Sequence, residues 1–166
     1  MIATLKYGTI LSAAGGLAVV YIVHGWWPLA LPVAAVGLLW GLGSGQGRRW
    51  PAEVGLLLLI AAAGTGLLGL GLSIWESFLA VVLTLTAWDL DHFQRQFQGV
   101  SRTAATARVE RSHLLRLLLV AVGSAAVAGV ASAFQLQFGT GLAALLAALV
   151  VCAIGEAIAF FRRESD

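Results

Sequence analysis

The sequence predicts an all-α protein: a polytopic transmembrane bundle of about six helices, with both termini cytoplasmic and the fourth and fifth helices extended into a cytoplasmic hairpin. Composition, the length of the apolar segments and the placement of basic residues support this fold class. Of 166 residues, 60% are hydrophobic and 11% are charged, and the mean hydropathy is +0.92. A soluble domain carries about 25% charged residues. The chain therefore has too little polar surface for a water-soluble globule.

Apolar segments long enough to cross a bilayer fill almost the whole chain. A transmembrane helix needs about 20 mostly apolar residues. The expected spans are about 8–24, 28–43, 54–72, 76–92, 113–134 and 140–160. Because little sequence is left over, we expect a single integral membrane domain over residues 1–166.

The basic residues predict the orientation of these spans. The short loops at 24–27, 73–77 and 135–139 contain no lysine or arginine. All the basic residues fall on the other side: Lys6, Arg48, Arg49, Arg95, Arg102, Arg108, Arg111, Arg116, Arg162 and Arg163. The positive-inside rule then places both termini in the cytoplasm of a protein integral to the cytoplasmic (inner) membrane. Basic residues at that surface favour anionic lipid, at about 1 kcal/mol each, over nucleic acid.

Local signals support several helix boundaries in turn. Small residues spaced four apart, such as Gly37 and Gly41 in the second span, let helix backbones approach closely. Before the third span, Pro51 takes the first helical position and Glu53 the first turn. Before the fourth, Ser73 and Glu76 have capping-box spacing. In the last span, Ala143 and Ala147 form another small-residue pair.

The fourth helix is expected to continue beyond the membrane. Leu90, Phe93, Phe97 and Val100 recur at helical spacing past the end of the span. Gly99 is a natural helix stop, because glycine tolerates the left-handed conformation. The segment "TAATARVERSHLLRLLL" then reads as a second helix that runs into the fifth span. Together the two helices form the predicted hairpin.

The hairpin gathers ionisable side chains at the cytoplasmic rim of the bundle. A turn near residues 99–102 brings Asp91 level with Glu110 or Arg111, and Asp89 level with Ser112 or His113. The candidate rim cluster consists of acids and imidazoles: Asp89, Asp91, His92, Glu110, His113 and Glu156. Three interpretations stand: an ionic clasp between the two helices, a metal site, or a partner-binding surface.

The metal site would use two acid-x-x-His pairs on antiparallel helices. Its ligands would be Asp89, His92, Glu110 and His113, whose spacing resembles that of paired-metal sites in four-helix bundles. A metal ion is the one cofactor that the sequence suggests. Such sites also need carboxylates from two further helices, and the neighbouring arginines oppose a bound cation. The ionic clasp is the simpler interpretation.

Glu156 lies inside the sixth span, close to Arg162. A carboxylate within the membrane is costly and is a functional candidate by default. Pairing with Arg116 or His113 of the neighbouring helix is the structural alternative.

The sequence favours a non-catalytic function. It contains no phosphate loop, CxxC or HExxH motif, and the middle of the membrane is almost wholly apolar. We expect an accessory, assembly or scaffolding subunit that presents a basic hairpin surface to a membrane protein partner, to another copy of the chain or to anionic lipid. That surface consists of Arg95, Arg102, Arg108 and Arg111. The alternative is a small-solute transporter, the substrate-binding subunit of an uptake system, or a metal-dependent membrane enzyme that uses the rim cluster.

Overall fold

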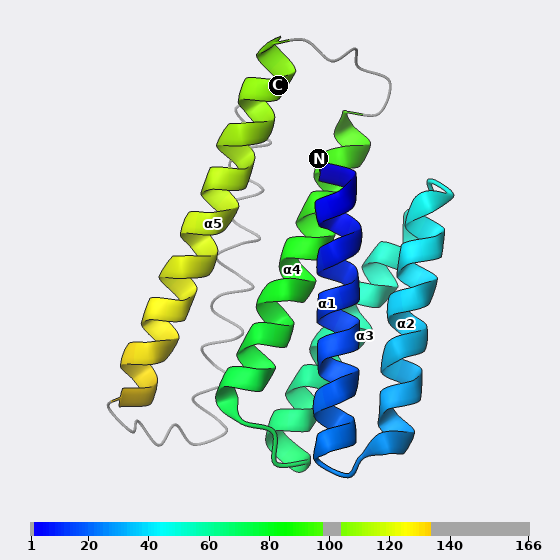
Figure 1. The fold of residues 1–166 in the computed structure, drawn as a ribbon, viewed down its shortest axis with the longest axis vertical. Helices are drawn as coiled ribbons and strands as arrows, with labels where there is room; N and C mark the ends of the chain where they lie inside the picture. The colour runs from blue at the N-terminus through cyan, green and yellow to red at the C-terminus, as the bar shows by residue number, and fades with distance from the viewer. Residues whose placement is uncertain (1, 98–103, 134–166) are drawn as a thin grey trace. The chain divides into compact units, whose positions relative to one another are not determined.

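A computed structural model describes residues 2–97 and 104–133, which form α-helices and no strand (Figure 1). The five helices of this part of the chain are α1 (Ile2–Val23), α2 (Trp27–Gly45), α3 (Trp50–Gly69), α4 (Ile74–Gln96) and α5 (Ala104–Ala133). The chain divides into two compact units between Leu117 and Leu118. The first unit holds α1 to α4 and the N-terminal half of α5. The prediction of an all-α fold is confirmed for the described residues.

Three of the described helices, α1, α2 and α3, are long and apolar enough to cross a membrane. This finding supports a membrane protein. The predicted fourth span lies within α4, and residues 113–133 of the predicted fifth span are helical in α5. The predicted sixth span, with Ala143 and Ala147, lies outside the described residues. The total of six spans and the cytoplasmic placement of the termini therefore stay predictions.

The helix boundaries can be compared with those predicted from the sequence. α4 continues to Gln96, beyond the expected membrane boundary at residue 92, and α5 begins at Ala104, as the hairpin prediction requires. The turn itself, with Gly99 and Arg102, lies outside the described residues. α1 begins at Ile2 rather than near residue 8. The difference arises because Lys6 lies within the packed part of this helix.

Side-chain caps and glycine turns connect α1 to α4. Ser73 and Glu76 form the predicted capping box, in which Ser73 Oγ accepts a hydrogen bond from Glu76 N at 3.2 Å and Glu76 Oε2 accepts one from Ser73 N at 2.7 Å. Pro51 and Glu53 occupy the first turn of α3. Each of the three connections contains a glycine with a φ between +73 and +81°, a conformation that other residues rarely adopt: Gly25, Gly47 and Gly71.

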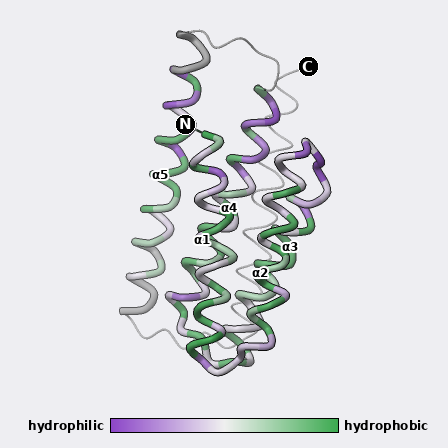
Figure 2. The backbone as a smooth tube through the Cα atoms, turned by 45° about the vertical axis from the view of Figure 1, so that its right-hand side comes forward, coloured by the Kyte–Doolittle hydropathy of each residue, from purple (hydrophilic) through white to green (hydrophobic). Residues whose placement is uncertain are grey.

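α1 packs against both α2 and α4, and α3 packs against α2 and α4 (Figure 1). Their buried side chains form one apolar core, in which Trp40, Tyr21 and Leu59 are the largest fully buried residues. The Tyr21 hydroxyl of α1 donates a hydrogen bond to the Ala62 carbonyl of α3 at 2.6 Å. Many exposed residues of these helices are also apolar, and Figure 2 shows hydrophobic residues along much of α1, α2 and α3. An apolar exterior is what a bilayer requires of a spanning helix.

Gly37 and Gly55 are among the glycines that lie at close contacts between the helices. A side chain at Gly37 in α2 would collide with Ala14 of α1, and one at Gly55 in α3 would come within 2.6 Å of the Trp40 ring. Gly37 therefore serves packing between the protein's own helices, as small residues do in membrane bundles. At Gly41, the other member of the predicted pair, no atom lies within 4 Å of an added Cβ.

We predict that Gly37→Ala lowers the free energy of unfolding by about 1–3 kcal/mol, because the added methyl group overpacks the contact between α1 and α2. Gly41→Ala is the matched control and leaves stability unchanged or raises it by up to about 1 kcal/mol, since alanine favours helix over glycine. Denaturant unfolding in detergent micelles, followed by circular dichroism, measures both. Equal losses for the two variants would contradict the assignment of Gly37 to the helix contact.

Candidate functional site

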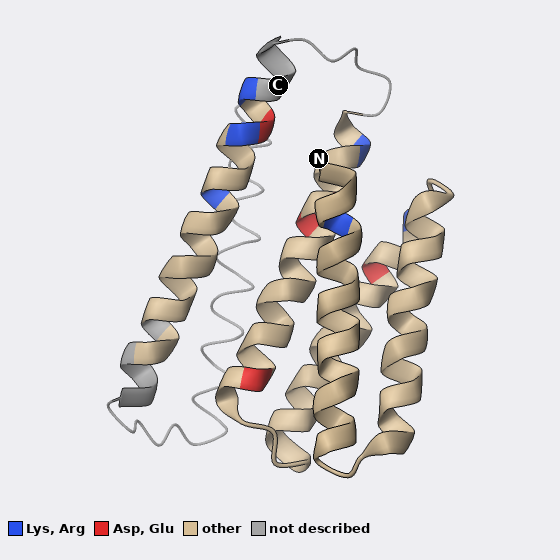
Figure 3. Ribbon diagram, in the orientation of Figure 1, with Lys and Arg blue, Asp and Glu red and all other residues tan. Residues whose placement is uncertain are grey.

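Charged side chains of the first unit gather at one end of the bundle. This end contains the N-termini of α1, α3 and α5 and the C-termini of α2 and α4 (Figure 3). Within residues 2–97 and 104–117, Glu76 is the sole charged residue at the opposite end. The segregation expected from the positive-inside rule is therefore present in the fold. We call this charged end the basic end of the bundle.

A buried ion cluster connects α1, α2 and α4 at the basic end. Lys6 Nζ donates a hydrogen bond to Ser44 Oγ at 2.7 Å and lies 3.3 Å from Asp91 Oδ1. The Ser44 hydroxyl in turn donates to the same carboxylate oxygen. Lys6 and Asp91 are only 3% and 1% exposed. One carboxylate oxygen thus binds groups from two other helices.

Arg95 binds the second oxygen of the same carboxylate. Its Nε and one terminal nitrogen donate to Asp91 Oδ2 at 2.9 and 2.6 Å. Its other terminal nitrogen donates to the Gly47 carbonyl at 3.1 Å, in the turn between α2 and α3. Arg95 was expected on a docking surface, but its side chain is only 13% exposed. The guanidinium instead completes the solvation of Asp91.

Lys6 and Ser44 were not included in any site predicted from the sequence, although their helical spacing places both on the apolar, packed face of their helices. The buried face of α1 runs through Ile2, Lys6, Ile10 and Leu17, so the lone lysine of the chain shares the packed stripe. Ser44 follows Trp40 by four residues on the buried face of α2. A basic residue on a packed helical face needs a buried acidic partner, because an uncompensated charge in the interior is strongly unfavourable.

His113 joins α5 to α4. Its Nε2 lies 2.6 Å from Asp89 Oδ2, and its ring stacks on Phe93 with centroids 4.1 Å apart and planes 12° apart. Leu114 and Leu117 pack beside this contact against a small cluster that includes Leu90. The hairpin register, which placed Asp89 level with Ser112 or His113, is confirmed.

The other members of the rim cluster are not brought together. Asp91 faces α1 and α2 instead of Glu110 or Arg111, because residues two apart on a helix point to nearly opposite sides. His92 stacks on Trp88 with centroids 5.6 Å apart. Among residues 2–97 and 104–133, no group of three or more histidine, cysteine, aspartate or glutamate side chains is placed to hold a metal ion. Glu156 lies outside the described residues.

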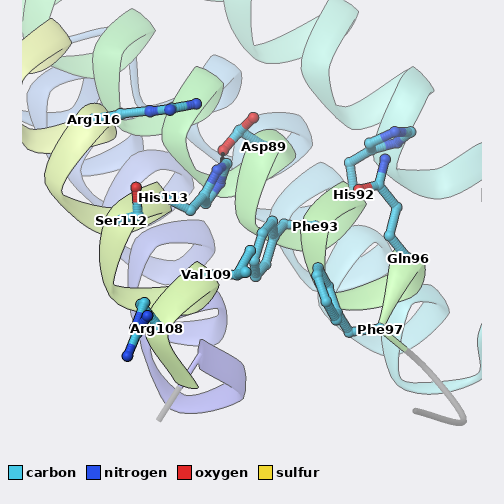
Figure 4. Close-up of a pocket in the computed structure, with 10 residues that line it drawn as sticks. All are labelled: Asp89, His92, Phe93, Gln96, Phe97, Arg108, Val109, Ser112, His113 and Arg116. Atoms are coloured by element: carbon cyan, nitrogen blue, oxygen red, sulfur yellow. Dashed lines mark hydrogen bonds and ion pairs between the residues drawn. The ribbon is translucent and has the colours of Figure 1, made fainter. Parts of the chain in front are cut away.

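A cavity of about 650 Å³ lies between α4 and α5 at the basic end. Two helical stripes line it. Figure 4 shows Asp89 and Phe93 of α4 beside His113 of α5, while His92 and Gln96 point away from α5. The stripe on α5 consists of Arg108, Val109, Ser112, His113 and Arg116, and the stripe on α4 of Asp89, His92, Phe93, Gln96 and Phe97. Both follow the three- and four-residue spacing of one helix face. We call this space the α4–α5 cavity.

Comparison with known protein families, with curated proteins and with solved structures found no match for this chain. The function must therefore be inferred from the residues and their geometry.

We predict that Asp91→Asn destabilises the bundle by about 3–5 kcal/mol, because removing one partner of a buried ion pair leaves Lys6 charged and uncompensated. Asp89→Asn, in the same helix but half-buried, costs about 1 kcal/mol or less. Unfolding in detergent micelles compares the two variants. A loss for Asp91→Asn no greater than that for Asp89→Asn would show that the buried cluster does not stabilise the fold.

Proposed function

We propose that this chain is a non-catalytic accessory or assembly subunit of the cytoplasmic membrane, which presents the basic end of α4 and α5 to a membrane protein partner, another copy or anionic lipid. One observation carries the proposal: the first half of α5 exposes the side chains of Arg108, Arg111 and Arg116. Exposed arginines on a rigid helix suit the recognition of carboxylates and phosphates, because each guanidinium donates two parallel hydrogen bonds.

The buried charges and the exposed charges at the basic end have separate roles. Lys6 and Arg95 both bind Asp91, and Arg95 also binds the Gly47 carbonyl, so these charges serve the fold. The α5 arginines lie on a separate helix, which contacts α4 through the Asp89–His113 pair and the stack of His113 on Phe93. Interaction at the surface of α5 thus leaves the ion cluster undisturbed. Arg102, another residue of the expected docking surface, lies outside the described residues.

The test is charge reversal on α5 in the native membrane. We predict that Arg108→Glu combined with Arg111→Glu lowers the amount of co-purified partner at least about ten-fold, since each reversal replaces attraction by repulsion at the contact. Arg48→Glu is the control, because Arg48 is exposed at the same end but belongs to the turn after α2. Chemical cross-linking before extraction, followed by mass spectrometry, identifies and quantifies the partner. Unchanged association with every variant would reject the proposal.

A second candidate, a small-solute transporter, is favoured by the buried charges alone. Ionisable residues within a membrane bundle often mark solute or proton pathways. Under this alternative, Asp91→Asn would abolish solute uptake by reconstituted protein while leaving its melting temperature unchanged. Under the accessory function, the same substitution lowers the melting temperature because the cluster is structural. Uptake and thermal unfolding of one variant therefore separate the two functions.

A further inference from the structure

We propose that the α4–α5 cavity binds the headgroup of an anionic phospholipid that carries two phosphates. This inference rests on the proposed function and names the ligand of the same end of the bundle. The cavity is large enough for a headgroup, at about 650 Å³. It is lined entirely by described residues of the first unit.

The charge balance of the cavity favours an anion. Its lining contains two guanidinium groups, from Arg108 and Arg116, and one carboxylate, from Asp89. With neutral imidazoles the lining carries a net charge of +1, the difference of these two counts. The Asp89 carboxylate is already bound by His113 at 2.6 Å. The two guanidinium groups therefore determine the sign of the charge that a ligand contacts in the cavity.

The spacing of the two arginines favours two phosphates over one. Arg108 and Arg116 are eight residues apart on α5, which corresponds to about 12 Å along the helix at about 1.5 Å per residue. Figure 4 shows them at opposite ends of the cavity, with Ser112 and His113 between them. Each guanidinium can bind one phosphate through two parallel hydrogen bonds. The Ser112 hydroxyl supplies a further donor between these positions.

The surroundings of the cavity favour a lipid over a soluble phosphate compound. Phe93, Phe97 and Val109 give it apolar walls. Leu85, one turn from Asp89 on the same face of α4, is 43% exposed, and Leu115 on α5 is 56% exposed. Acyl chains can lie on these apolar side chains while the phosphates remain at the basic end. A basic pocket between membrane helices with an apolar approach is the arrangement that recognises anionic headgroups.

The experiment uses the full chain, purified in detergent and stripped of lipid, and measures lipid binding by native mass spectrometry. The probes are cardiolipin, phosphatidylglycerol and phosphatidylcholine, with inorganic pyrophosphate as the soluble phosphate. We predict that cardiolipin binds most tightly and that Arg108→Gln with Arg116→Gln weakens its binding about 25-fold. The estimate takes about five-fold per arginine, the equivalent of about 1 kcal/mol each. Arg48→Gln is the control and changes binding less than about two-fold.

Three outcomes would overturn the inference. An effect of Arg48→Gln equal to that of the Arg108→Gln, Arg116→Gln double variant would show general attraction to the basic end. Binding of phosphatidylglycerol as tight as that of cardiolipin would reject a two-phosphate site, and displacement of cardiolipin by equimolar pyrophosphate would indicate a soluble ligand. Unchanged melting temperatures verify that the variants fold. Since lipid binding is measured without any partner, unchanged co-purification in the charge-reversal variants together with the predicted cardiolipin binding would reject only the accessory function.

Discussion

The buried ion pair between Lys6 and Asp91 is the constraint on which the charged end of the bundle depends. A carboxylate withdrawn from water costs several kcal/mol unless its oxygens are fully bound. Here Ser44 and Arg95 supply the remaining hydrogen bonds, so four side chains from three helices must be in position at once. An apolar contact between α1 and α4 tolerates sliding, whereas this cluster does not. It therefore fixes the relative height of α1, α2 and α4.

The same end of α4 also binds α5, because helical geometry directs neighbouring acidic residues to different sides. Asp89 and Asp91 are two residues apart, and at about 3.6 residues per turn they point in nearly opposite directions. Asp91 is buried against α1 and α2, while Asp89 meets His113 of α5 and lines a cavity. A structural carboxylate and an accessible one thus lie within one turn, on opposite sides of α4. This separation lets α5 present arginines to the outside without disturbing the core.

The position of α5 follows from few contacts of high specificity. The His113 ring both binds the Asp89 carboxylate and stacks on Phe93, so one side chain fixes the rotation of the first half of α5 about its axis. That rotation places Arg108, Ser112 and Arg116 along one side, facing α4. Arginines spaced along a helix form a binding surface only when a contact such as that of His113 with α4 fixes the rotation of the helix. The proposed lipid site is a consequence of this contact.

Sequence alone determined the features that follow from composition and local periodicity. These are the all-α class, the apolar segments that became α1 to α3, the Ser73 capping box and the pairing of Asp89 with His113, since each depends on spacing along the chain. The tertiary structure decided the partners of Asp91 and Arg95. Asp91 binds Lys6 and Ser44, and Arg95 binds the Gly47 carbonyl. These partners come from segments distant in the sequence, and hydropathy does not specify how helices rotate against each other. Packing at Gly37 and the buried pair together decide that rotation, because close contact and charge neutralisation must be satisfied in the same arrangement.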